Sequence, residues 1–347
     1  MRIKFERQTL DKENLYPVFD IVLRFVESGR HSFDIDAIND IEESSWGKRA
    51  GDTAIDLIKQ SALMTSHYSS DQNPLVVIDD TAPSGGVVDL ERRLTRVEPL
   101  DAIYFLTLPF AVIVENEIFD GSFLLWMAKS TNNQSFISAY RRNLFQFRHA
   151  GGKGGLSNSS KVFSDGVWPR SDGAYSRALQ LWNGVMLDSD AEFPQHRPND
   201  GIVKACQETA AWVHELQARS IENYLPKEAL LKFLQNPADR ARVYKYFELS
   251  DEQRNHYNLK KGFKKKQDSE PSKSDFQADL NTPAEVRTLY RNVPDEAWSF
   301  LVTGFGAGLS QIFVDEQHRP NTGVIEFPTA AAREEVDAIL KKVLRSV

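Results

Sequence analysis

The sequence contains little cysteine and no long apolar run. Its one cysteine, Cys206, cannot form an internal disulfide or a cysteine-rich zinc site. No stretch approaches the roughly 18 uninterrupted apolar residues of a transmembrane helix, and residues 1–6 lack the apolar core of a signal peptide. We therefore expect a cytoplasmic protein that is not bound to a membrane.

The sequence also lacks internal repeats and nucleotide-binding motifs. No fixed period recurs, which argues against solenoids and propellers. Lys153 is followed by Gly154 rather than by Ser or Thr, so this glycine-rich segment is not a P-loop. Residues 304–308, Gly-Phe-Gly-Ala-Gly, lack the preceding strand of a dinucleotide-binding loop, which favours a helix end or close helix packing. Any ATP-driven step would therefore belong to another protein.

The composition is that of a folded globular protein. Hydrophobic residues make up 41% and charged residues 26% of the 347 residues, enough for a buried core and, by length, about two domains. The net charge of -7 argues at first against nucleic-acid binding, since nucleic-acid-binding proteins are usually basic. The bases are nevertheless concentrated, because residues 129–161 and residues 253–267 each contain six Lys or Arg and no acid. These two basic segments can contact a phosphate backbone although the whole chain is acidic.

Strand-like apolar runs alternate with helix-compatible segments in the middle third of the chain. This order is typical of a parallel sheet with crossover helices, so the predicted fold class is α/β. Residues 1–105 are expected to form a mixed N-terminal α/β region and residues 106–232 a central parallel sheet with flanking helices. Residues 233–347 are expected to be mostly helical, with a basic, polar loop around 253–280.

Individual elements can be predicted from the same patterns. Expected strands are 75–78, 110–114, 144–147 and 184–187. Expected helices are 15–26, 121–129, 176–182 and about 203–216, of which 212–217 also has a strand-like pattern, and Pro226 suits the first turn of another helix. Residues 267–279 are expected to be an exposed loop, followed by a mostly helical pattern from residue 282.

Acidic residues directly follow two of the expected strands. Glu115 comes after the run 110–114, and Asp188 and Asp190 come after the run 184–187. The carboxyl ends of parallel strands meet at the edge where open α/β sheets bind ligands, and side chains at i and i+2 of an extended segment share a face. Carboxylates without Cys or clustered His suit Mg²⁺ or Mn²⁺. Acids also end strands because they face water, but three acids placed in this way favour a metal site.

The central region resembles a known domain. A strand ending in Glu115, a glycine-rich turn at 149–155 and a third strand ending in Asp188-Ser-Asp190 are similar to the Toprim domain of topoisomerases, primases and OLD-family nucleases. The resemblance covers about residues 106–232. It includes Ile-Glu-Asn-Tyr-Leu-Pro at 221–226 and extends more weakly to 255–263.

The resemblance implies specific roles for the acids. In this family the strand-end Glu performs general acid or base work, and the Asp-x-Asp pair holds Mg²⁺ or Mn²⁺ near a phosphodiester. Glu115, Asp188 and Asp190 are therefore the expected catalytic residues and metal ligands, with Glu222 as a further ligand. Glu222 equally suits the start of a helix, where the helix dipole favours an acid.

Two departures from the family pattern leave alternatives open. Asn116 stands where the family commonly has Gly, and the acid of the next helix lies one residue late, at Asp120. Either Glu115 or Glu117 can therefore be the functional acid. Glu117 and Asp120 remain supporting candidates, as does His149, although a lone histidine after a strand is more often packed or solvated than functional.

Basic residues near the acids are candidates for binding substrate phosphate. The expected contacts are Lys153 in the glycine-rich turn and Lys260 and Lys261 in the second basic segment. The turn can also be purely structural, and a Lys-rich loop is usually a solvated surface.

The resemblance predicts a Mg²⁺- or Mn²⁺-dependent endonuclease. It suggests the toxic effector of an OLD-like anti-phage defence system that acts by abortive infection, paired with a partner ATPase or sensor protein. The expected substrate is nucleic acid, DNA rather than RNA. The sequence leaves the oligomeric state open, a homo-oligomer included.

Other functions remain to be weighed against the nuclease. A topoisomerase or primase would need further modules that this sequence does not show. The main alternative is a catalytically degenerate Toprim-like protein with a regulatory or nucleic-acid-binding role.

Overall fold

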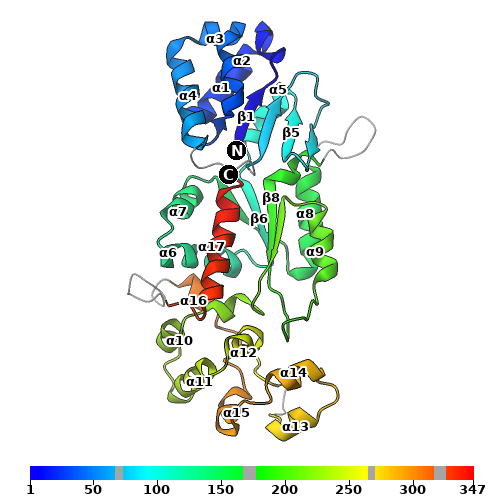
Figure 1. Ribbon diagram of the computed structural model, residues 1–347, viewed down its shortest axis with the longest axis vertical. Helices are drawn as coiled ribbons and strands as arrows, with labels where there is room; N and C mark the ends of the chain where they lie inside the picture. Colours follow the sequence, from blue (N-terminus) through cyan, green and yellow to red (C-terminus); the bar gives the residue numbers. More distant parts are fainter. Residues whose placement is uncertain (67–72, 167–176, 265–269, 316–325) are drawn as a thin grey trace.

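A computed structural model describes residues 1–66, 73–166, 177–264, 270–315 and 326–347. The chain builds an N-terminal sheet with helices, a central sheet with helices on both sides, and a group of C-terminal helices, arranged along the long axis of the molecule (Figure 1). The first sheet is mixed and the second is parallel, which confirms the predicted α/β class.

The N-terminal part contains a five-stranded sheet with strand order β2-β1-β3-β5-β4. Only β4 is antiparallel to its neighbour, β5. The expected strand at 75–78 is confirmed as β3. The strands are β1 Arg2–Phe5, β2 Ser32–Phe33, β3 Leu75–Ile78, β4 Val87–Asp89 and β5 Leu94–Val97. The helices are α1 Tyr16–Glu27, α2 Ile38–Glu43, α3 Ser45–Ala50, α4 Asp52–Ser66 and α5 Pro99–Thr107.

The central part contains a four-stranded, fully parallel sheet with order β7-β6-β8-β9. Every residue of β6 and β8 is buried, which explains why these strands are nearly continuous apolar runs. Helices α6 and α7 lie on one side of the sheet and α8 and α9 on the other (Figure 1). The strands are β6 Phe110–Val114, β7 Phe145–His149, β8 Asn183–Leu187 and β9 Trp212–Glu215, and the helices are α6 Phe119–Ser130, α7 Gln134–Arg141, α8 Leu156–Asp165 and α9 Asp200–Gln207.

The strand order of this sheet reverses between β6 and β8. The chain passes from β6 outward to β7 and then returns across the sheet to β8 and β9. Open α/β sheets bind ligands outside the carboxyl ends of their strands at such a reversal. The residues that follow β6 and β8 therefore occupy the usual ligand position of this architecture.

The predicted helix at 203–216 is wrong in its second half. Helix α9 ends at Gln207, and residues 212–215 form strand β9, as their strand-like pattern also indicated. Trp212 pairs with Gly184 of β8, and a Cβ atom on Gly184 would lie 2.2 Å from the Trp212 ring. The missing side chain of Gly184 thus makes room for an indole on the next strand, a tertiary fit that helical periodicity does not reveal.

Other element boundaries differ from the prediction by smaller amounts. Strand β7 runs two residues past the expected end and includes His149. Residues 178–182 form a 3-10 helix, while residue 176 lies outside the described residues. Pro226 directly precedes α10 rather than lying in its first turn.

The C-terminal part is helical, as expected. Of the predicted loop at 267–279, residues 267–269 lie outside the described residues, and 273–278 form helix α13 instead. The Ser272 side chain caps the N–H of Asp275, and Phe276 is buried, so local capping and packing both favour this helix. The helices are α10 Lys227–Phe233, α11 Pro237–Phe247, α12 Asp251–His256, α13 Lys273–Ala278, α14 Ala284–Leu289, α15 Asp295–Leu301, α16 Gln311–Val314 and α17 Ala330–Leu344.

The glycine-rich residues 304–308 pack against another backbone segment. The N–H of Phe305 donates to the carbonyl of Leu259 at 2.6 Å, and Gly262 forms an isolated bridge with Thr303. This contact agrees with close packing and not with a dinucleotide loop.

Helix α17 returns from the C-terminal part to the central part, beside α6 and α7 (Figure 1). Within the described ranges, the molecule has no helix with the length and apolar character needed to cross a bilayer.

Candidate functional site

Three predicted acids meet Lys153 at the carboxyl ends of β6 and β8. The Nζ atom of Lys153 lies 3.5 Å from Oε1 of Glu115 and 2.5 Å from Oδ2 of Asp190. The same ammonium donates to the carbonyl oxygen of Asp188 at 2.9 Å. Residues that follow β6 and β8 thus lie together around the positive charge of the Lys153 ammonium.

Asp188 is buried next to other carboxyl groups. Its Oδ1 accepts a hydrogen bond from the N–H of Ile221 at 3.0 Å. Burial raises the pKa of Asp188 well above its usual value, and the negative charges of Asp120, Glu222 and Glu115 raise it further. A cation placed beside this carboxyl group would lower its pKa again and favour the ionised form.

Asp120 belongs to this group as well. Its side chain is buried, and its Oδ2 accepts the N–H of Asn116 at 2.9 Å. Burial raises the pKa of Asp120 to about 7, with further contributions from Glu115 and Glu222. Glu117, in contrast, is exposed. Of the two alternative strand-end acids, Glu115 is the one that faces the cluster.

Glu222 approaches the same group from a different segment. It lies in a 3-10 helix, Ile221–Tyr224, and is only 1% exposed. Its Oε1 lies 3.0 Å from Nζ of Lys260. Its Oε2 is buried and, within the described part of the chain, accepts no hydrogen bond. Lys260 thus neutralises Glu222 much as Lys153 neutralises Glu115 and Asp190.

A buried asparagine shapes the backbone after β8. The Nδ2 atom of Asn199 donates to the carbonyls of Asp188 and Ser189 and to Oε1 of Glu215. Asp190 has a φ of +53°, a left-handed conformation that Asp tolerates better than most residues. The loop is therefore held in a form that keeps Asp188 and Asp190 near the ends of both strands.

The glycine-rich turn after β7 positions Lys153. Gly151 and Gly152 have φ values of +76° and +101°, and a Cβ atom on Gly155 would lie 1.9 Å from the carbonyl oxygen of Ala150. Only glycine fits this path without strain. The turn directs the Lys153 side chain toward the acids, where it is 18% exposed.

Besides Glu117, two other predicted residues lie outside this cluster. His149 ends β7 with an exposed side chain, and Lys261 is also exposed. Lys261 contributes its backbone N–H to the side chain of Asn258.

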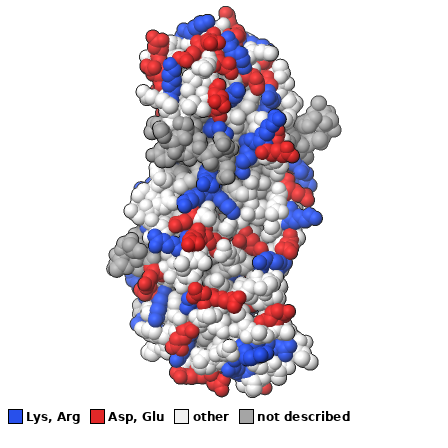
Figure 2. Space-filling view, in the orientation of Figure 1, with Lys and Arg blue, Asp and Glu red and all other residues white. Residues whose placement is uncertain are grey.

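Several bases of the two basic segments have structural partners. Arg142 donates to the carbonyls of Ser28 and Gly29, and Arg148 lies over the ring of Phe163. Arg254 is buried and bonds to four neighbouring groups, so it is not available to a phosphate. Lys265 and Lys266 lie outside the described residues. Acidic and basic side chains are intermixed on the face shown in Figure 2. The individual lysines beside the carboxylates are therefore better candidates for binding phosphate than the two basic segments as a whole.

The donor set fits a hard divalent cation by its chemistry. Five carboxyl groups converge. Oε2 of Glu222 is buried and accepts no hydrogen bond in the described part of the chain, and Oε1 of Glu115 is buried 3.5 Å from Nζ of Lys153. Among the described residues, no group of three or more Asp, Glu, His or Cys side chains is arranged to hold a metal ion. The two lysine ammoniums explain this arrangement, because each lies against carboxylates that a metal ion would need.

The raised pKa of Asp120 predicts a pH-dependent stability. The pKa of Asp120 is about 7 in the folded chain, against an ordinary value of 3.8. As pH rises between these two values, the unfolded chain loses its proton first, so the free energy of unfolding falls. Without divalent metal, the wild type should lose about 2–3 kcal/mol of stability from this group between pH 5 and pH 8. Asp120→Asn should remove that loss. Urea unfolding in EDTA at several pH values measures it, and equal slopes for the two proteins would refute the expected effect.

The chain matches no known family model, no curated protein and no solved structure. The arguments about this site therefore rest on its geometry and chemistry.

Sequence reasoning missed a second polar cluster behind the site. Glu335 of α17 is 4% exposed and accepts from Nε2 of His214 and from the N–H of Gln217 at 2.8 and 2.9 Å. Its other oxygen accepts the hydroxyl of Tyr224, two residues after Glu222. The helical spacing of Ala332, Val336, Ile339 and Val343 places Glu335 on the apolar face of α17, and this was the signal that could have separated it from the exposed Glu334.

Proposed function

We propose that the chain is a divalent-metal-dependent nuclease with a Toprim-like central domain that hydrolyses phosphodiesters of nucleic acid. The observation that carries this proposal is the convergence of five carboxyl groups at the strand-order reversal, one of which, Glu222, has a buried oxygen that accepts no hydrogen bond within the described residues. Structural ion pairs would not need so many acids in one place, because burial first, and then the repulsion between the carboxylates, raises the pKa of Asp188 and Asp120.

The carboxylates would hold Mg²⁺ or Mn²⁺. Asp188, Asp190 and Glu222 are the proposed ligands, together with Glu115. A bound divalent ion supplies charge stabilisation at the phosphate and a more acidic water. Burial raises the pKa of Glu115, which suits a residue that accepts and returns a proton.

The lysines have a second role in this proposal. Lys153 and Lys260 hold carboxylate oxygens in the structure. A cation at the carboxylates would take over this neutralisation and leave both ammoniums free to bind phosphate oxygens. Both lysines are therefore proposed to move from carboxylate to substrate when the site is loaded.

The proposed setting is anti-phage defence, in which the chain would be a toxic effector controlled by a partner ATPase or sensor. DNA is the favoured substrate. This part of the proposal is supported only by the resemblance of residues 106–232 to OLD-type nucleases.

One observation favours a binding protein as the second candidate. Lys153 and Lys260 already neutralise carboxylates of the cluster, so the site keeps its geometry without a metal ion. A degenerate Toprim-like regulator would use the same lysines and bind nucleic acid without cutting it.

A cleavage assay separates the two candidates. Supercoiled plasmid and labelled single- and double-stranded oligonucleotides are incubated with the purified chain in EDTA, Mg²⁺ or Mn²⁺. We expect cleavage only with the divalent ions. Binding of equal strength in EDTA and in metal, with no cleavage in either, would overturn the nuclease and support the binding protein.

A further inference from the structure

A cavity lies between the central part and the C-terminal helices, beside the carboxylate cluster. Its volume is about 390 Å³, within the range of about 300–1,000 Å³ that is usual for small-ligand sites. Its walls come from the loops after β8 and β9, from the segment after α12, and from helices α13 and α14.

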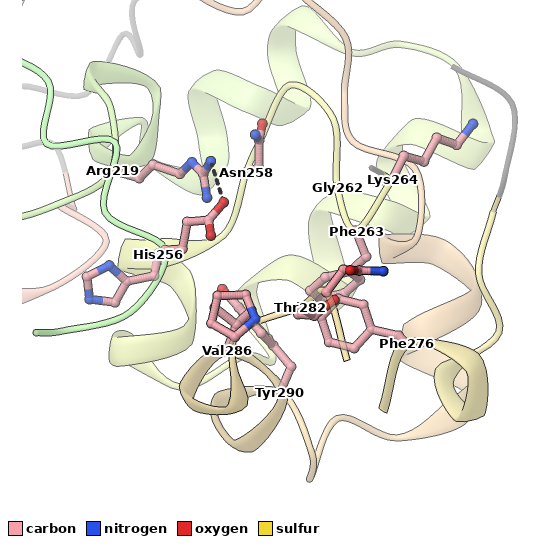
Figure 3. Close-up of a pocket in the computed structure, with 13 residues that line it drawn as sticks. Arg219, His256, Asn258, Gly262, Phe263, Lys264, Phe276, Thr282, Val286 and Tyr290 are labelled. Atoms are coloured by element: carbon pink, nitrogen blue, oxygen red, sulfur yellow. Dashed lines mark ion pairs between the residues drawn. The ribbon is translucent and has the colours of Figure 1, made fainter. Parts of the chain in front are cut away.

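The two sides of this cavity differ in chemistry. Phe263, Phe276 and Tyr290 line one side, and their rings are fixed by contacts of 5.3 Å between Phe263 and Phe276 and 4.8 Å between Phe263 and Tyr290. Arg219 and Glu192 line the other side, paired at 3.5 Å between Nη2 and Oε1 (Figure 3). The three aromatic side chains are 6%, 5% and 2% exposed, so the cavity offers a small apolar aromatic surface opposite a donor and an acceptor.

The polar side of the cavity shares its backbone with the carboxylate cluster. Glu192 is two residues beyond Asp190, and the N–H of Asp190 donates to the carbonyl of Arg219 at 2.9 Å. Asn258, another wall residue, is two residues before Lys260. Two residues of extended chain span about 7 Å, so a strand bound at the acids reaches the cavity within a few nucleotides.

We propose that this cavity binds one unpaired nucleobase of the nucleic-acid strand held at the carboxylates, and so selects where the strand is positioned. The inference rests on the proposed function, which supplies the nucleic-acid strand. That the bound group is a nucleobase is argued from the residues that line the cavity.

A nucleobase fits both sides of the cavity. Its planar face packs on aromatic side chains, a contact that is largely independent of sequence. Its edge carries donors and acceptors that match the guanidinium of Arg219 and the carboxylate of Glu192. The pair is loose enough to open, since Glu192 remains 40% exposed. A base must leave its stack to enter, which favours single-stranded or distorted sites.

Binding of single-stranded DNA 12-mers tests the pocket without requiring cleavage. A series of fluorescein-labelled oligonucleotides, each with one abasic position, is titrated with the wild-type chain in Ca²⁺, a hard divalent ion that suits carboxylate oxygens. We expect one position to weaken binding about tenfold, because it removes the stacked base. Affinities that are equal across the series, or the absence of any binding, would overturn the proposal.

Three variants assign the effect to the cavity. Arg219→Gln keeps the backbone bonds of residue 219 and should abolish the difference between abasic and intact oligonucleotides. Asn281→Trp, at the exposed rim, should do the same by filling the space. Arg197→Gln makes the same charge change in the neighbouring cavity and should retain the wild-type pattern. An unchanged pattern in both Arg219→Gln and Asn281→Trp would contradict the assignment.

The abasic binding series and the metal-dependent cleavage assay together distinguish failure of the pocket from failure of the proposed function. Selective loss at one abasic position without metal-dependent cleavage would leave the pocket intact and reject the nuclease. Cleavage with no selective position would reject the pocket alone.

Discussion

Replacing both Asp188 and Asp190 with Asn should lower the rate of nucleic-acid cleavage at least about a thousandfold. A metal ion contributes several kcal/mol to the transition state, and each 1.36 kcal/mol is a factor of ten in rate. The fold should survive, because Asn is close in shape to a neutral Asp188 and can accept the same N–H of Ile221. Asn also tolerates the left-handed φ of residue 190. Plasmid cleavage in Mn²⁺ at pH 8 measures the loss.

Two further variants sharpen this result. Glu115→Gln should lose cleavage to a similar extent, whereas Glu117→Gln should cleave at the wild-type rate because Glu117 is exposed and outside the cluster. Circular dichroism confirms that each variant is folded. If the double Asn variant cleaves as fast as the wild type, the assigned mechanism is wrong.

Replacing Glu335 with Ala should destabilise the chain by about 3–5 kcal/mol. The substitution leaves the buried Tyr224 hydroxyl and two partly buried donors, Nε2 of His214 and the N–H of Gln217, without their acceptor. It also weakens the attachment of α17 to the segment that carries Glu222. We expect the midpoint of thermal unfolding to fall by about 4–7 °C.

The neighbouring acid provides the matched control. Glu334 lies on the same helix with an exposed side chain, so Glu334→Ala should change the midpoint by no more than about 2 °C. Differential scanning calorimetry of both variants makes the comparison. Equal midpoints would show that the Glu335 cluster does not stabilise the fold.

The buried strands could be predicted because burial on both faces requires apolar residues along the whole strand. Strands β6 and β8 are covered on both faces, so their residues are continuously apolar, and the acids that follow them emerge at the sheet edge. Parallel order then brings Glu115 near Asp188 and Asp190 without further information.

The partners of these acids could not be predicted in the same way. Lys153 reaches Asp190 across 37 residues and Glu335 reaches His214 across 121 residues, and both contacts depend on how distant elements pack. Asp120 was only a supporting candidate in the sequence, because its burial beside the other acids depends on the packing of distant elements. Strand β9 could be predicted only in part from its own sequence, because its Trp212 packs over Gly184 of the neighbouring strand β8.

The most direct test of a carboxylate metal site is a calorimetric titration of the wild-type chain with Mn²⁺ at pH 8. This pH lies above the pKa of about 7 of Asp120, so protons compete least with the metal. The proposed site predicts saturable binding that is lost in the Asp188→Asn/Asp190→Asn variant. Binding that is absent from the wild type, or unchanged in the variant, would contradict it.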